Sequence, residues 1–346
     1  MSRASSILGA AIALSLAAST SAIAAPKPPP GTSTAPAQVF APNPVADLGI
    51  QTLTDQKDAD YFSADPTLAQ AYHRVTLTDL DGSGTLTGSY AKVISETGKA
   101  AANTGNGFIY TRDQDQFEQT MAYLWVTRAQ RYIQSLGFGS SLPEVNRRPQ
   151  LLRINQFGGD NSFYREGTGK LTITLGKGGV DDAEDAEVIV HEYGHSVQDN
   201  QVPGFGSTPE AGAIGEAFGD YLAVTVSEHF ARTADEPCVA DWDSVSYTST
   251  TPHCLRRVDG SKHYREDLVG EVHADGEIWS RALWDIHEAL GAKLADTIII
   301  RAQFGFTRDI SMPAAAQTTI DTAGLYSTSA RKAVSAAFAA RGLVTS

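Results

Sequence analysis

Two short runs of alternating hydrophobic and polar residues predict strands in the first third of the chain. Arg74–Thr78 and Thr85–Thr87 alternate with a period of two, and Asp79–Gly84 between them is rich in turn-forming residues. This pattern predicts a β-hairpin. The turn also resembles the first half of a calcium-binding loop, but Tyr90 stands where the glutamate of the twelfth position belongs. Calcium binding stays open but is not supported by the sequence, which favours a plain hairpin.

A helix is predicted farther along, where the hydrophobic period lengthens. Large apolar and aromatic residues recur three or four positions apart over Thr111–Leu136, and Gly137 follows them as a helix-ending residue. An aromatic stripe at this spacing is typical of core packing, so we assign it no binding role. Leu171–Thr174 alternates again and predicts a strand, and after a Gly-rich stretch Asp181 and Asp182 are candidate N-caps of a second helix.

The N-terminus has the three regions of an export signal. Arg3 precedes an apolar run over Ile7–Ala18, and small residues follow up to Ala24. We therefore expect residues 1–24 to be a cleaved signal peptide, which predicts a secreted protein, extracellular or periplasmic. The apolar run is shorter than the roughly 20 residues that span a bilayer, so no membrane anchor is expected. Residues 25–37 are rich in proline and predict an extended linker.

Composition and charge narrow the partners of the mature chain. A formal net charge of −13 over 346 residues, with no basic run, argues against nucleic acid. We expect a monomer that is large enough for two lobes. Cys238 and Cys254 lie sixteen positions apart, and in an oxidising compartment they predict a disulfide worth roughly 3 kcal/mol. Two separate buried thiols are the alternative.

The segment that follows the predicted N-caps carries the candidate chemistry. His191 and His195 stand one helical turn apart in HEYGH, so both imidazoles can reach one metal ion from the same helix face. Glu192 lies beside them and can act on a metal-bound water, as in the H-E-x-x-H pattern. Glu216 follows His195 by 21 residues and predicts a third ligand, while Asp220 one turn later can hold a ligand imidazole. Three protein ligands are typical of catalytic zinc. A surface histidine pair and an exposed acidic helix face are the alternatives.

These segments resemble a known family. The motifs HEYGH, GAIGEAFGD from Gly212 and VHADGEIW from Val272 are similar to those of the thermolysin-like (gluzincin) zinc metallopeptidases, closest to the fungalysin family. VFAPNPV resembles the start of a fungalysin catalytic domain, and DNSFY resembles the edge strand that pairs with substrate in these enzymes. The likeness spans about residues 38–300.

The resemblance implies an α+β, two-lobed fold. A β-rich N-terminal lobe, mixed and largely antiparallel, is expected over residues 38–180. A mainly α-helical C-terminal lobe that carries the zinc site is expected over residues 181–346. The helix with HEYGH is expected to lie between them and to floor a substrate cleft.

The resemblance also implies a role for each matching residue. The zinc ligands, the general base and the carboxylate behind the ligands fall on His191, His195 and Glu216, on Glu192 and on Asp220. His273 matches a histidine that stabilises the transition state, Arg256 an arginine that holds a substrate carbonyl, and Asn161 an asparagine that bonds the substrate main chain. The residues themselves leave alternatives open, namely a capping or core histidine, a solvated arginine and a turn asparagine.

Three departures from related patterns shape the expectation. The stretch QVPGFGSTPE after the H-E-x-x-H helix has no tyrosine to assist the oxyanion, so His273 is expected to act alone. Fungalysin-like enzymes usually carry a long propeptide, whereas little sequence separates the export signal from VFAPNPV, so the route to latency is not predicted. Gln201 stands where metzincins need a third histidine, and no G-x-M-E-N-like stretch supports an aminopeptidase.

These features together predict a zinc metalloendopeptidase that acts on polypeptides. One Zn²⁺ is expected to activate a bound water, with Glu192 as the general base. Val188, about one turn before the motif, is expected to line a side-chain pocket whose preference the sequence does not predict. Two other readings stay open: an inactive secreted binding protein on a peptidase fold, and a zinc hydrolase of non-peptide amides or esters.

Overall fold

The computed structural model describes residues 33–53, 66–94, 98–146, 148–156, 158–165, 171–231 and 233–345. The predicted signal peptide over residues 1–24 and residues 25–32 of the predicted linker lie outside these ranges. Within the described ranges, no helix combines the length and the apolar character that crossing a membrane requires.

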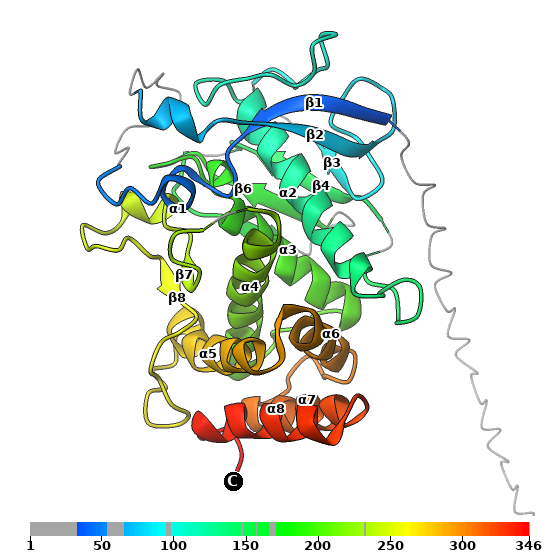
Figure 1. Cartoon of the computed structure of the whole chain (residues 1–346), viewed down its shortest axis with the longest axis vertical. Helices are drawn as coiled ribbons and strands as arrows, with labels where there is room; N and C mark the ends of the chain where they lie inside the picture. The colour runs from blue at the N-terminus through cyan, green and yellow to red at the C-terminus, as the bar shows by residue number, and fades with distance from the viewer. Residues whose placement is uncertain are drawn as a thin grey trace, which may run out of the picture.

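The described chain has an α+β architecture in which most strands precede most helices (Figure 1). The strands are β1 Ser33–Val39, β2 His73–Leu80, β3 Ala91–Val93, β4 Gln150–Ile154, β5 Phe163–Arg165, β6 Thr172–Leu175, β7 Cys238–Val239 and β8 Arg256–Arg257. The α-helices are α1 Pro44–Leu48, α2 Gln116–Ser135, α3 Ala186–Gln201, α4 Pro209–Phe230, α5 Val272–Leu290, α6 Ala292–Gln303, α7 Met312–Gly324 and α8 Thr328–Ala340. Short 3₁₀ turns are η1 Leu68–Ala71, η2 Asp182–Glu184 and η3 Asp243–Ser246.

The largest sheet has four strands in the order β3-β4-β6-β5. The strands β3, β4 and β6 run parallel, and β5 at the edge pairs antiparallel with β6. The expectation of a largely antiparallel lobe is therefore wrong for this sheet. Parallel neighbours need a long crossover connection, and the segment containing α2 supplies it between β3 and β4. The predicted strand at Leu171–Thr174 is present as β6, and part of DNSFY forms the edge strand β5.

The linker predicted over residues 25–37 is too long, because β1 begins inside it. Residues 33–37 of that linker belong to β1, which pairs antiparallel with β2. Pro36 lies opposite Thr76 in this pairing, and its carbonyl accepts the Phe108 N–H at 2.8 Å, so it bonds a segment other than β2. The alternate side chains of the strand are buried and give it one apolar face: Ala35, Ala37 and Val39.

The predicted β-hairpin is wrong, although its first strand is present as β2. β2 pairs with β1, whereas Thr85–Thr87 contributes isolated bridges rather than a strand. Asp79 has a left-handed backbone with φ of 62°. Its buried carboxylate accepts a hydrogen bond from Arg131 Nε of α2 at 3.0 Å, so the chain bends toward that helix. Asp81 accepts the Ser83 N–H at 2.8 Å, so both turn carboxylates have protein partners.

The long helix α2 begins at Gln116 rather than at Thr111 as predicted. The Thr111 carbonyl accepts the Gln114 N–H at 3.0 Å and closes a turn ahead of the helix. This turn directs Arg112 inward, where the side chain is buried and pairs with Glu184 at 2.8 Å. The predicted packing role is confirmed, because the aromatic residues of the stripe are buried: Phe117, Trp125 and Tyr132.

The C-terminal part of the chain is mainly helical. α3 and α4 pack together in the middle of the molecule, α5 packs against α4, and α7 and α8 pair at the end that carries the C-terminus (Figure 1). One hydrophobic core extends from β1 to α8. The predicted disulfide is present between Cys238 and Cys254, with Cα atoms 5.4 Å apart. It fastens β7 to the loop that leads into β8.

Candidate metal centre and substrate cavity

α3 carries the H-E-x-x-H motif and begins later than predicted. Its N-cap is Asp185, whose carboxylate accepts the Glu187 N–H at 2.9 Å. The predicted caps Asp181 and Asp182 are wrong, because Asp181 precedes the extra turn η2, Asp182 begins it, and α3 starts only after it. The apolar side of α3 is anchored in the core by Ile189, Val190, Tyr193 and Val197.

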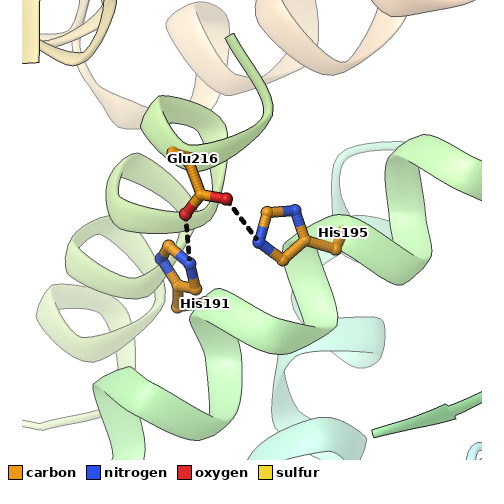
Figure 2. A group of neighbouring side chains, drawn as sticks. All are labelled: His191, His195 and Glu216. Atoms are coloured by element: carbon orange, nitrogen blue, oxygen red, sulfur yellow. Dashed lines mark ion pairs between the residues drawn. The ribbon is translucent and has the colours of Figure 1, made fainter. Parts of the chain in front are cut away.

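Three side chains from α3 and α4 converge on one point, as Figure 2 shows. His191 Nε2 lies 3.2 Å from Glu216 Oε2, and His195 Nε2 lies 3.6 Å from Glu216 Oε1. One donor atom from each residue lies within 4.8 Å of the other two, which is a spacing that a single ion can bridge. The structure thus brings together the three residues that the sequence indicated as metal ligands.

Two glycines allow α3 and α4 to approach closely enough for this convergence. A Cβ atom on Gly194 would lie 2.9 Å from Gly219 Cα, and a Cβ atom on Gly219 would lie 2.7 Å from His191 Nδ1. Both distances are too short for real side chains. A larger residue at either position would therefore separate the helices or displace the His191 ring.

Asp220 holds His191 from behind. His191 Nδ1 lies 2.8 Å from Asp220 Oδ1, which leaves Nε2 facing Glu216. Arg256 donates to both Asp220 oxygens, from Nε at 2.6 Å and from Nη2 at 2.7 Å. Burial alone would raise the pKa of Asp220, but Arg256 and His191 hold it well below its usual range. The carboxylate is therefore ionised and suited to orient the imidazole.

The charges at the three donors favour a cation. Burial alone would raise the pKa of Glu216, but His195 and His191 hold it below its usual range, so the side chain is ionised. Burial lowers the pKa of His195 to about 4, which keeps this imidazole neutral. Burial would also lower the pKa of His191, but hydrogen bonds with Asp220 and Glu216 raise it to about 10. With this pKa, His191 carries a proton when no cation is bound, and a metal ion at this point would displace that proton and meet the ionised Glu216 and the neutral His195.

Glu192 stands beside these donors without joining them. It is 6% exposed, and its Oε2 atom is buried with no hydrogen-bond partner among the described residues. Burial raises the pKa of Glu192 to about 7, with His191 opposing the rise and Glu216 adding to it. A carboxylate with a pKa near neutrality that lines the cavity is suited to transfer protons.

His273 reaches the same site from the first turn of α5. Its Nε2 lies 3.2 Å from Glu216 Oε2 and its Nδ1 lies 2.7 Å from Glu271 Oε1. The side chain is 49% exposed, so the alternative of a core histidine is wrong. Glu271 also caps α5 by accepting the N–H groups of His273 and Ala274. Sequence reasoning missed Glu271, although an acidic residue directly before a helix was the signal that could have indicated it.

The three metal donors, Glu192 and His273 border a cavity of about 620 Å³. Val188 lines the cavity, as expected, and so does Arg256. Asn161 also lines it but lies just before the edge strand β5 rather than inside it. The loop after α3 contributes Phe205 and no tyrosine to the wall. The cavity thus joins the metal donors, Glu192 and His273 to the end of an edge strand.

Comparisons with known proteins agree with this geometry. The sequence profile of the fungalysin metallopeptidases, family M36, matches residues 88–298, which include every candidate site residue. Among solved structures, the fold is similar to that of the precursor of protealysin, a metalloproteinase from Serratia proteamaculans. The TM-score is 0.55 at 16% identity, over 83% of this chain and 96% of that one. No curated protein matches the sequence.

Proposed function

The chain belongs to the fungalysin metallopeptidases, and from this premise we propose that it is a secreted, zinc-dependent endopeptidase in which Glu192 is the general base. One observation carries the proposal. His191, His195 and Glu216 converge within 4.8 Å at the wall of a cavity, beside a buried carboxylate oxygen of Glu192 that has no partner in the described part of the chain.

The three donors fit zinc better than a harder metal. Two imidazole nitrogens and one carboxylate oxygen form a set typical of catalytic zinc, whereas calcium and magnesium prefer oxygen ligands throughout. Only three protein groups converge among the described residues, so the cavity side is left open for substrate. Zinc bound there would polarise the scissile carbonyl and lower the pKa of a water molecule.

Glu192 performs the proton transfers in this proposal. Its unpartnered Oε2 accepts a proton from the attacking water and then returns it to the nitrogen of the leaving amine. The raised pKa of the carboxyl, about 7, suits both steps, because the group accepts and releases a proton at similar cost near neutrality. Its burial also keeps bulk water from competing for the proton.

Three other side chains position the substrate in this proposal. His273 Nε2, whose ring is held through Nδ1 by Glu271, donates to the oxyanion as it forms. Arg256 has Nη1 free of hydrogen bonds to the described residues, because Nε and Nη2 serve Asp220, and this nitrogen donates to a substrate carbonyl. Asn161 at the start of the edge strand bonds the main chain of an extended substrate.

Metal content and hydrolysis of a denatured protein test the proposal together. Purified protein should contain about one zinc per chain and should cleave reduced, denatured casein. Activity should be lost to 1,10-phenanthroline, restored by zinc, and unaffected by serine or cysteine protease inhibitors. Zinc content near zero would contradict the proposal. Tight binding of casein without cleavage would favour the inactive binding protein, and turnover confined to esters or non-peptide amides would favour the other hydrolase.

Secretion is supported by the disulfide, which forms in oxidising compartments. N-terminal sequencing of protein collected outside the expressing cells tests it. The mature chain should begin near residue 25, after the predicted signal peptide. Retention of the full chain inside the cells, with Met1 present, would contradict secretion.

A further inference from the structure

A second group of acidic side chains lies at the same cavity, and two of its three members line the wall. Asp160, Asp182 and Asp243 each contribute one carboxylate oxygen to a group whose members lie within 4.8 Å of one another. They come from the loop before β5, from η2 and from η3, and both Asp182 and Asp243 form part of the cavity wall. We call these three residues the acidic cluster.

Two members of the acidic cluster are buried, and no described cationic side chain forms an ion pair with any of the three. Asp182 is 2% exposed and Asp243 is 3% exposed, and the Oδ1 atom of each is buried without a hydrogen-bond partner from the residues that the structure describes. In the part of the chain that the structure describes, no lysine, arginine or histidine forms an ion pair with any of the three. Buried like charges without a partner are strongly unfavourable. This arrangement therefore needs an external cation or bound protons.

The contacts that the acidic cluster does make come from neutral groups. Ser162 Oγ donates to Asp182 Oδ2, and Tyr247 Oη donates to Asp160 Oδ1 at 2.6 Å. Burial raises the pKa of Asp182 to about 7, with Ser162 opposing and Asp160 adding to the rise. Burial also raises the pKa of Asp243 well above its usual range, with Asp182 among the neighbours that add to it. A cation placed among them would restore ionisation and gain the attraction of all three.

We propose that the acidic cluster binds the cationic side chain of a substrate lysine or arginine next to the cleaved bond. This inference rests on the proposed endopeptidase function and names the substrate class of that site. In other proteases, one buried carboxylate in a specificity pocket selects substrates with a basic side chain. Here three carboxylates lie together at the cavity.

The position of the acidic cluster relative to the metal centre supports the inference. Asp182 and Asp243 line the same cavity as Glu192, His191 and His195, so the cluster and the metal centre face one bound substrate. The same cavity has apolar wall residues Val188, Val239 and Leu255. A lysine or arginine lays its aliphatic stem on such a surface while its charged end reaches polar groups. The nearby guanidinium of Arg256 is already held by Asp220 and is not drawn into the cluster.

Cleavage-site mapping tests the inference. Zinc-loaded protein digests a denatured protein mixture, and mass spectrometry identifies the new ends. Lysine and arginine should be enriched at one of the two positions that flank the cut. In matched peptides that carry lysine or the uncharged norleucine at that position, kcat/KM should favour lysine by about 100-fold. Equal rates for the two peptides would overturn the inference.

Variants locate the preference. Asp243→Asn and Asp182→Asn should each lower the lysine-to-norleucine ratio of kcat/KM by at least about tenfold, because each removes one charge that faces the substrate cation. Asp241→Asn is the matched control. Asp241 is a neighbouring buried acid with an unpartnered Oδ1 and a raised pKa, but it does not line the cavity. Its substitution should leave the ratio unchanged, and an equal fall in all three variants would overturn the inference.

A binding measurement separates this inference from the proposed function. If the zinc-loaded protein cleaves no peptide, the proposed function fails, and calorimetry of the lysine and norleucine peptides then tests the acidic cluster without turnover. Tighter binding of the lysine peptide, lost in Asp243→Asn, supports the inference. The inference would also be overturned if calcium raised the melting temperature of the parent protein but not of Asp243→Asn, and if the protein showed no preference for lysine. These results would identify a divalent-cation site.

Discussion

The cavity has two acidic sides that differ in their partners. On the metal side, Glu216 and Asp220 face histidines and Arg256, and the pKa values of both carboxyls are lowered despite their burial. On the other side, Asp182 and Asp243 of the acidic cluster face other carboxylates, and their pKa values are raised. The residue types are alike, and the presence or absence of cations from the chain itself decides their ionisation.

This difference indicates two roles for a buried carboxylate. An internal counter-ion makes the charge of Asp220 permanent, which suits it to hold His191 in one orientation. A carboxylate without an internal counter-ion responds to whatever cation enters the cavity. The first arrangement supports a fixed metal centre, and the second supports recognition of a charged substrate.

Glu192 lines the same cavity as both sides, and its substitution is expected to have the largest effect. Glu192→Gln removes the proton acceptor but no metal donor, so zinc content should stay at the parent level. Catalysis should fall about 10³–10⁴-fold, the upper range for loss of a general base. Steady-state hydrolysis of a quenched peptide, measured beside the zinc content, checks this. A variant that keeps most of its activity would assign the base to another residue.

His273 sharpens the account of the metal side. His273→Ala should lower kcat and kcat/KM together by about 10²–10³-fold, because Nε2 of the histidine donates to the substrate only as the oxyanion forms. Zinc content and KM should stay near the parent values. Glu271→Gln is the graded control: it weakens the hold on His273 Nδ1 and should cost less than the alanine variant. A His273→Ala protein that melts earlier but is fully active when folded would indicate a helix-capping role instead.

Substitution of Asp220 tests whether its charge, which His191 and Arg256 keep ionised, supports metal binding. Asp220→Asn keeps the shape of the side chain but removes the charge that His191 Nδ1 and Arg256 share. The zinc affinity should fall about 10–100-fold, the usual loss when a carboxylate behind a ligand histidine is removed. Competition with a chromogenic chelator measures it. Asp182→Asn is the matched change in the acidic cluster and should leave zinc affinity at the parent level. Equal losses of zinc affinity in the two variants would contradict the distinction between the two sides.

The acidic cluster should make the free energy of unfolding depend on pH, and this is the smallest of the expected effects. Below about pH 4 the Asp182 carboxyl is protonated in both the folded and the unfolded chain. As the pH rises, the unfolded chain loses the proton first, whereas the folded chain keeps it until about pH 7. Stability therefore falls as pH rises through this window.

Asp182→Asn cannot ionise and should escape that fall. The variant should be about 1–2 kcal/mol more stable than the parent at pH 8 and equal to it at pH 4, since one pKa unit corresponds to about 1.4 kcal/mol and neighbouring acids share the shift. Urea unfolding at both pH values, without substrate, measures this. A variant that is less stable than its parent at pH 8 would show that the Asp182 charge is already compensated in the folded protein.

The residues of the metal side could be predicted because their spacing within single helices is visible in the sequence. The spacing of His191 and His195 fixes their common helix face, and Glu216 with Asp220 repeats that logic on the next helix. Helix starts were less predictable. The caps at Asp181 and Asp182 were wrong because an extra 3₁₀ turn precedes α3, and α2 starts late because Arg112 turns inward to a distant glutamate.

The acidic cluster could not be predicted, because it is assembled from distant parts of the chain. Asp160 lies before an edge strand, Asp182 on η2 and Asp243 on η3, and nothing in their spacing shows that they meet. The same limit explains the wrong hairpin. The partner of β2 is β1, more than 30 residues earlier in the chain, and short alternating runs do not identify distant partners.

The central claim is that His191, His195 and Glu216 hold a catalytic zinc, and zinc K-edge X-ray absorption of the purified protein tests it most directly. The account predicts a shell of nitrogen and oxygen neighbours at about 2.0–2.1 Å with the outer scattering of two imidazoles. Glu216→Ala should lose this signal. A shell that contains sulfur at about 2.3 Å, or a zinc signal that is unchanged in Glu216→Ala, would contradict the account.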